Sequence, residues 1–201
     1  MKLPRRFSGT ASFWPQANSR VSEPSRTFDA DALRSALDEL CERLVDAEVS
    51  AGICIVGGAA IALTVAPERI ATHDIDVVIY PQSATAAVLH VVAEMAVARG
   101  WPNDWLSDAV RGFLPFAGDP GWTTVRAAGQ VEIRMAPADL LLAMKLHAAR
   151  GARDASDIRV LLQATGTTSA GDAEALYERY YPGEVLKPRA RAVVAAYFTG
   201  S

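Results

Sequence analysis

Two aspartates, Asp74 and Asp76, have the residue type and the spacing of a divalent-metal clamp. They stand at the start of the β-branched run Val77–Ile79, and residues two apart in a strand point to the same face. Two adjacent carboxylates repel each other, and an oxygen-binding cation such as Mg²⁺ (or Mn²⁺) relieves that repulsion. An isolated Asp-x-Asp is more often a solvated acidic turn. The residues around the pair therefore decide between a metal clamp and such a turn.

A pair of glycines, Gly57 and Gly58, follows the short apolar run Ile53–Val56. Glycine lets the backbone approach a ligand closely. The helix expected after the pair would point its N-terminal N–H groups at the same place, which favours phosphate. A tight turn explains most Gly-Gly pairs, but one strand ahead of an Asp-x-Asp this pair predicts a phosphate cradle beside a metal site.

Charged residues farther along the chain have structural and functional explanations. Lys145 lies in an apolar stretch, where a lysine more often extends its ammonium group to the surface. Asp154 and Asp157 are one helical turn apart and share a face, which is also typical of an exposed helix with weak ion pairs. Arg69 precedes the acidic strand and is either a phosphate contact or an ordinary surface arginine.

The elements that must position these residues follow from hydrophobic periodicity. A leucine-rich stripe between Leu33 and Leu44 predicts a first helix with a cap at Asp29 or Thr27. The predicted strands are 53–56, 75–80, 123–127 and 131–135. The other predicted helices are 59–65, 84–99, 138–149, 155–165, 173–180 and 188–198. This order predicts an α/β or α+β core with a helical C-terminal part, and an irregular stretch over 100–119.

The bulk composition is that of a globular protein. Of 201 residues, 50% are hydrophobic, and the net charge of −3 does not suggest a protein that coats nucleic acid. We expect a basic Ser/Pro-rich segment at 1–27, a core at 28–136 and the helical part at 137–201. No apolar run reaches the roughly 18 residues of a membrane span. Cys41 and Cys54 fit buried, reduced thiols, so we expect a cytoplasmic protein with no membrane contact.

Together these residues resemble the polymerase-beta-like nucleotidyltransferase superfamily, whose signature is a Gly-Gly or Gly-Ser turn followed by Asp-x-Asp on the next strand. Within it, the likeness is closer to nucleotidyltransferase toxins of the AbiEii and mycobacterial MenT type. The resemblance spans roughly Ile53 to Leu162 and is carried by Val56–Gly58, Thr72–Asp76, Pro137–Lys145 and Arg153–Ile158. It implies a nucleotidyltransferase-type mixed sheet flanked by helices.

The resemblance implies a role for each candidate residue. Asp74 and Asp76 would hold one or two Mg²⁺ (or Mn²⁺) ions, and Lys145 would lie near the triphosphate as a point charge. Asp157 would orient Lys145 or the acceptor. Many members carry a third carboxylate on a later strand, and Glu132 has the expected apolar–acid–apolar neighbours. Glu132 could equally be the solvent-facing residue of a hairpin. Phosphates would be bound by Gly57, Gly58, Arg69 and Lys145.

In the toxin branch the acceptor is typically the 3′ end of tRNA, which receives a pyrimidine nucleotide from an NTP, and a cognate antitoxin protein accompanies the toxin. The basic N-terminal segment and Lys187, Arg189 and Arg191 could contact RNA phosphates, or they could be ordinary surface charges. Two alternatives stay open. The acceptor could be a small molecule or a protein hydroxyl, or the chain could be a catalytically silent nucleotide-binding module.

Overall fold

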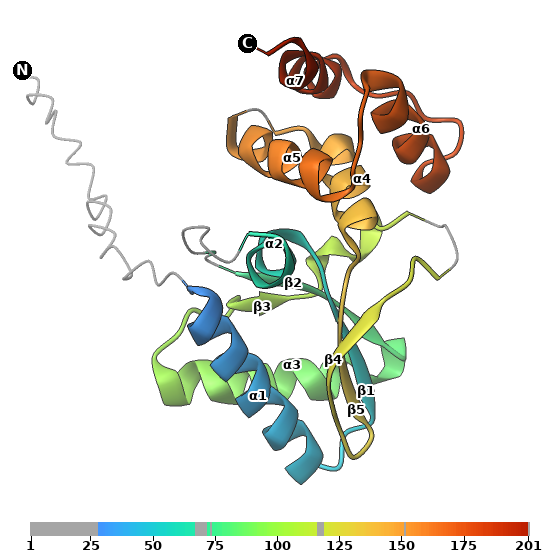
Figure 1. The fold of residues 1–201 in the computed structure, drawn as a ribbon. Coiled ribbons are helices and arrows are strands. Elements are labelled where there is room, and N and C mark those ends of the chain that lie inside the picture. The colour runs from blue at the N-terminus through green and yellow to red at the C-terminus, as the bar shows by residue number, and fades with distance from the viewer. Residues whose placement is uncertain (1–27, 67–71, 73, 116–118, 151, 201) are drawn as a thin grey trace, which may run out of the picture.

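A mixed five-stranded sheet lies at the centre of the fold, in a computed structural model that describes residues 28–66, 72, 74–115, 119–150 and 152–200 (Figure 1). The strand order is β3-β2-β1-β5-β4. β1 is antiparallel to β2 and parallel to β5, while β3 is parallel to β2 and β4 is antiparallel to β5. The strands are β1 Ala51–Ile55, β2 Ile75–Tyr80, β3 Leu106–Ser107, β4 Thr123–Ala128 and β5 Val131–Met135.

The described residues form seven α-helices, so the predicted mixed α/β class with a helical C-terminal part is confirmed. α1 and α3 pack against each other; α1 contacts β4 and β5, and α3 contacts β2. The helices are α1 Ala30–Asp46, α2 Gly57–Thr64, α3 Thr85–Arg99, α4 Ala138–Ala148, α5 Ala152–Ala164, α6 Ala170–Tyr180 and α7 Pro188–Thr199. None of these described helices is long and apolar enough to cross a membrane.

The first helix begins where the sequence predicts. Asp29 is the N-cap of α1, and its side chain accepts a hydrogen bond from the backbone N–H of Ala32 at 2.8 Å. Such a cap satisfies one of the N–H groups that the first turn leaves unpaired. The predicted stripe, which includes Leu33, Leu40 and Leu44, is fully buried. α1 is therefore fixed by its cap and by one apolar face.

The two faces of the sheet differ in polarity. Ile53, Ile79 and Ile133 lie side by side in the register and are fully buried, so this face belongs to the core. The residues that alternate with them point to the other face, which carries the partly exposed Asp76 and Glu132. The polar face is therefore the one that can meet a ligand.

The stretch predicted to be irregular contains short ordered elements. β3 adds two residues to the edge of β2, and the 3₁₀ segment η2 Ala109–Phe113 follows it. A second 3₁₀ segment, η1 Gln82–Ala84, lies earlier in the chain, between β2 and α3. After Met135 the chain is helical, as expected. The hydroxyl group of Tyr181, just after α6, donates a hydrogen bond to the carbonyl oxygen of Phe113 at 2.9 Å. That bond ties the C-terminal helices to η2, which packs on β2.

Candidate active site

The two aspartates lie on the same side of the second strand. Asp74 is exposed and immediately precedes β2, and Asp76 is the second residue of that strand and is half-buried. Ile75, between them, is fully buried and belongs to the opposite face. The alternation that the sequence predicted is therefore present, and both carboxylates face away from the core.

The diglycine corner, Val56–Gly58, brings the start of α2 against Asp76. The backbone N–H of Val56 donates to the carbonyl oxygen of Asp76 at 2.9 Å. Gly57 has φ +66°, and a Cβ atom there would lie 3.2 Å from both Cβ and Cγ of Asp76, and closer still to its Oδ2. Glycine at position 57 is therefore required both by the backbone conformation and by the carboxyl group beside it.

The N-terminus of α2 is suited to an anion. Gly57 and Gly58 are its first two residues, and its N-cap, Val56, has an apolar side chain that cannot accept a hydrogen bond. Its first turn carries no acidic residue. Since the first N–H groups of a helix have no partner within the helix, a helix N-terminus of this kind can bind a phosphate.

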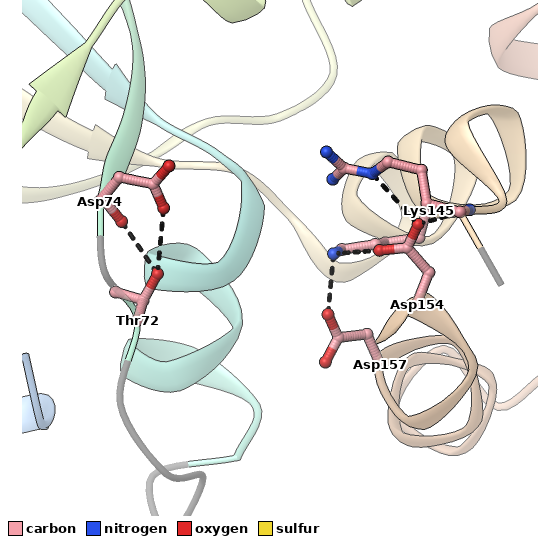
Figure 2. Close-up of polar contacts among 6 residues, drawn as sticks. Thr72, Asp74, Lys145, Asp154 and Asp157 are labelled. Atoms are coloured by element: carbon pink, nitrogen blue, oxygen red, sulfur yellow. Dashed lines mark hydrogen bonds and ion pairs between the residues drawn. The ribbon is translucent and has the colours of Figure 1, made fainter. Parts of the chain in front are cut away.

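Asp74 is held by its neighbours before the strand. The hydroxyl group of Thr72 donates to the carbonyl oxygen of Asp74 at 2.9 Å and lies 3.5 Å from its Oδ1 (Figure 2). Thr72 itself pairs with Phe28 through two backbone hydrogen bonds of 2.7 and 3.1 Å. The approach to the acidic pair is therefore anchored to the chain just before α1. Arg69, a predicted phosphate contact, lies outside the described residues.

A buried charge cluster lies on α4 and α5. The ammonium nitrogen of Lys145 is 2.9 Å from Asp154 Oδ1 and 2.8 Å from Asp157 Oδ2. The Lys145 side chain is 10% exposed, that of Asp157 2%, and that of Asp154 is fully buried. The sequence left open an exposed lysine and an exposed helix face, and the structure shows neither. Charges are buried to this depth only when they have partners, and here the three side chains are partners of one another. The predicted contact between Asp157 and Lys145 is present.

Asp154 is ionised within this cluster. Burial alone would raise its pKa, but hydrogen bonds from Lys145 and from the backbone N–H of Arg150, with the attraction of both cations, hold the pKa below its usual range. The Arg150 N–H donates to Asp154 Oδ2 at 2.7 Å. Asp154 thus uses one oxygen for Lys145 and the other for the loop between α4 and α5, and it fixes Lys145 relative to that loop.

The helix α2 contacts both β2, which carries Asp76, and α4, which carries Lys145. In Figure 2 the carboxyl group of Asp74 and the ammonium group of Lys145 point toward one another. The arrangement places two carboxylates, a helix N-terminus and a lysine around one corner of the sheet. Such a set can hold a divalent cation and the phosphates of a nucleotide.

Glu132 requires a correction, because the structure does not bring it to the aspartates. It pairs in register with Gly52, whereas Asp76 is level with Val56. Four residues of strand separate these levels, which is about 13 Å. Glu132 also accepts a hydrogen bond from Arg134 Nε at 2.8 Å. Among the residues that the structure describes, no group of three or more His, Cys, Asp or Glu side chains is arranged to hold a metal.

Asp154 is the site residue that the sequence analysis named without giving it a role. Its spacing of three residues from Asp157 correctly predicts a shared helix face. The burial of that face depends on packing between α4 and α5, for which the local pattern carries no signal. The apolar stretch around Lys145 was the available hint, since it places α4 in the core.

The fold and the site define a mixed α/β protein with an acidic pair packed against the corner between a strand and a helix. In comparisons with known proteins, no family model matches the chain, and neither the curated proteins nor the solved structures provide a significant match.

Proposed function

We propose that this protein is a metal-dependent nucleotidyltransferase that transfers a nucleoside monophosphate from an NTP to RNA, at the 3′ end of tRNA. One observation carries the proposal: the Asp76 carboxyl group packs against Gly57 at the N-terminus of α2, with Asp74 on the same side. Carboxylates and helix N–H groups are the ligands that a metal-bound triphosphate requires. The resemblance of these residues to the polymerase-beta-like superfamily supports the same reaction.

Each residue has a defined task in this reaction. Asp74 and Asp76 hold Mg²⁺ (or Mn²⁺), which when bound neutralises the triphosphate. Gly57, Gly58 and the first turn of α2 bind phosphate oxygens through backbone N–H groups. Lys145, fixed by its two aspartates, supplies a positive charge near the phosphates. Because Glu132 lies elsewhere, the chain would supply two carboxylates to the metal, and the nucleotide and water would supply the other ligands.

The chemistry is an in-line displacement at phosphorus. The acceptor hydroxyl oxygen forms a bond to the α-phosphorus, and the bond from that phosphorus to the α–β bridging oxygen breaks. Pyrophosphate leaves with the electron pair, and the hydroxyl proton passes to water or to a carboxylate oxygen of the acidic pair. The protein contributes position and charge, and it forms no covalent bond with either substrate.

An RNA acceptor and a role as the toxin of a toxin–antitoxin system are proposed from the resemblance. Transfer to the tRNA 3′ end would block aminoacylation and stop translation, and a cognate antitoxin protein would restrain it. Lys187, Arg189 and Arg191 at the start of α7 are candidates for RNA phosphate contacts. Transfer to a small molecule or a protein hydroxyl, and silent nucleotide binding, are the alternatives that the assay must separate.

The test is a transfer assay with each of the four labelled NTPs and purified tRNA, with and without Mg²⁺. We expect Mg²⁺-dependent labelling of RNA that Asp76→Ala lowers by at least about a hundredfold, the order of loss that follows removal of one electrostatic contact to a transition state. Asp46→Ala, at an exposed position in α1, is the matched control. Equal labelling by the wild type and Asp76→Ala would reject the assignment.

Parallel reactions with total protein and with small hydroxyl compounds identify the other acceptors. Expression adds an independent readout: a toxin slows growth, and Asp76→Ala abolishes the effect. Equal toxicity of both chains would exclude transfer as its cause. Nucleotide binding without transfer to any acceptor would leave the silent binding module as the correct description.

A further inference from the structure

A hollow of about 480 Å³ opens on the polar face of the sheet, away from the diglycine corner. It lies over the beginning of β1, the end of β2 and the middle of β5. Its lining includes Cys54, Tyr80, Trp122, Gln130, Glu132 and Arg134. Its volume falls within the usual range of small-ligand sites, which runs from about 300 to 1,000 Å³.

The hollow and the acidic pair share one face of the sheet. Asp76 and Tyr80 are four residues apart in β2, so their side chains emerge on the same side. Asp76 is level with Val56, and the lining residue Cys54 is two residues back along β1. The hollow therefore begins about 7 Å from the level of Asp76 and extends to Gly52, about 13 Å from it.

The charges of the hollow disfavour a phosphate. Glu132 and Asp119 contribute two negative charges and Arg134 contributes one positive charge, which already pairs with Glu132. Burial raises the pKa of Cys54 to about 11, so the thiol at the floor is neutral. An anionic ligand group would meet an excess of negative charge here, which points to a neutral ligand or a cationic one.

The chemistry of the lining fits a nucleobase. Trp122 packs partly against the core, which fixes its ring, and the ring also lines the hollow. Single-stranded bases are bound by stacking on aromatic rings or on arginine planes and by hydrogen bonds to their edges. Gln130, Glu132 and Arg134 offer donors and acceptors for such edges.

The geometry of the proposed reaction places the acceptor on this side. In the proposed reaction the triphosphate would lie toward Gly57 and Lys145, beyond the C-terminal end of β1. In an in-line displacement the attacking oxygen approaches the phosphorus from the side opposite the leaving pyrophosphate. That side is the one toward Cys54 and Arg134, where the hollow begins.

We infer that the hollow binds the terminal nucleoside of the RNA acceptor, stacked on Trp122, and delivers its hydroxyl group toward Asp76. This assignment rests on the proposed transferase function. It gives Glu132 and Arg134 a task in reading the base, in place of metal binding. The phosphates of the acceptor strand then lie outside the hollow.

Two variants test the hollow by opposite changes. Trp122→Ala removes the stacking surface, with Trp122→Phe as the control that keeps an aromatic ring. Gly52→Val fills the hollow instead. Gly52 is a strand residue without positive φ, and the atom nearest to a Cβ added there is the carbonyl oxygen of Tyr80, at 3.7 Å. A Cβ atom there meets only an ordinary contact distance, so we expect Gly52→Val to fold even if Trp122→Ala does not.

The kinetic readout is the KM for a single-stranded RNA acceptor against the KM for the NTP. We expect Trp122→Ala and Gly52→Val to raise the acceptor KM by about 5- to 150-fold, the range for loss of one base–aromatic stack, with the NTP KM unchanged. Trp122→Phe should retain most of the wild-type affinity for the acceptor. An unchanged acceptor KM in both variants overturns the inference.

Direct binding separates this inference from the transferase proposal. A fluorescein-labelled single-stranded RNA is titrated with the full chain without NTP, and its anisotropy is measured. Weaker binding by Trp122→Ala and Gly52→Val supports the hollow as a nucleoside site even if no transfer is found. Equal RNA binding by all chains overturns it. Binding of kanamycin, an amine-rich acceptor, that the two substitutions weaken while RNA binding stays unchanged also overturns it.

Discussion

The carboxyl group of Asp76 lies where a side chain at Gly57 would begin. One contact therefore links the acidic strand to the N-terminus of α2. The backbone of residue 57 must have positive φ to make this corner, and the side chain must be absent to leave room for the carboxylate. The proposed metal ligand and the proposed phosphate cradle are thus positioned by the same pair of residues.

The first prediction concerns this contact. Gly57→Ala should lower the free energy of unfolding by more than the roughly 1–2 kcal/mol expected for a non-glycine residue at positive φ. It should also abolish Mg²⁺-dependent NTP binding, because the new Cβ displaces the Asp76 carboxyl group. Urea unfolding and calorimetric titration with NTP measure the two effects.

Gly166→Ala is the matched control for this variant. Gly166 has φ +64°, close to the +66° of Gly57, but an added Cβ there meets nothing within 4 Å. It carries the backbone strain without the clash, and NTP binding should survive. If both variants lower the free energy of unfolding equally and both keep NTP binding, the contact between Gly57 and Asp76 is not needed for function.

The second prediction concerns the buried lysine. Lys145→Met leaves the carboxylates of Asp154 and Asp157 buried beside each other without their shared cation. Breaking a buried ion pair from one side costs about 3–5 kcal/mol, so this variant should be strongly destabilised. Chemical denaturation measures the loss.

A triple variant, Lys145→Met with Asp154→Asn and Asp157→Asn, separates stability from function. Because it removes the charges together, it should recover a large part of the lost stability. It should nevertheless transfer no nucleotide, since the positive charge near the triphosphate is gone. Recovery of both folding and transfer would show that Lys145 serves structure alone.

The third prediction is a pH dependence. The pKa of Asp154 is lower in the folded protein than in the unfolded chain, so its interactions contribute their full stability above the unfolded value, about 3.9. That contribution is lost as pH falls through the lower, folded value. The difference in unfolding free energy between the wild type and Asp154→Asn should therefore be constant from pH 7 to 6 and shrink below pH of about 4. A difference that grows on acidification would contradict the depressed pKa.

The sequence predicted those elements whose signals are local. The leucine stripe after Asp29 was sufficient to place a helix, and the apolar run after Asp76 was sufficient to place a strand. In both cases the periodic pattern is complete within the segment. β3 has two residues and depends on pairing with β2, so Leu106 and Ser107 carry no periodic signal of their own.

Glu132 shows where local reasoning about the site ends. Its apolar–acid–apolar pattern correctly fixes the face of the sheet, since Glu132 and Asp76 point to the same side. Its position along the strands depends on the register between β1 and β5, in which Gly52 pairs with Glu132. These two residues are far apart in the chain, and nothing in the sequence around either one specifies that pairing.

The fourth prediction concerns the link between the helical part and the sheet. Tyr181 donates its hydroxyl hydrogen to the carbonyl oxygen of Phe113, and its ring stacks on His147 with centroids 4.3 Å apart. Tyr181→Phe keeps the stack and removes the hydrogen bond, which should cost about 0.5–1.5 kcal/mol. Tyr197→Phe, in α7, is the control for loss of a tyrosine hydroxyl elsewhere in the helical part.

The same substitution should change the response to alkali. Burial raises the pKa of the Tyr181 hydroxyl, with Tyr177 and Glu184 adding to the effect, so the unfolded chain loses this proton at lower pH than the folded protein does. The stability that the neutral hydroxyl provides is present below the unfolded value, about 10, and falls as pH rises above it. Unfolding curves from pH 8 to 11 should therefore show a smaller decline for Tyr181→Phe than for the wild type. Parallel declines would mean that the hydroxyl ionises as readily in the fold as in the unfolded chain.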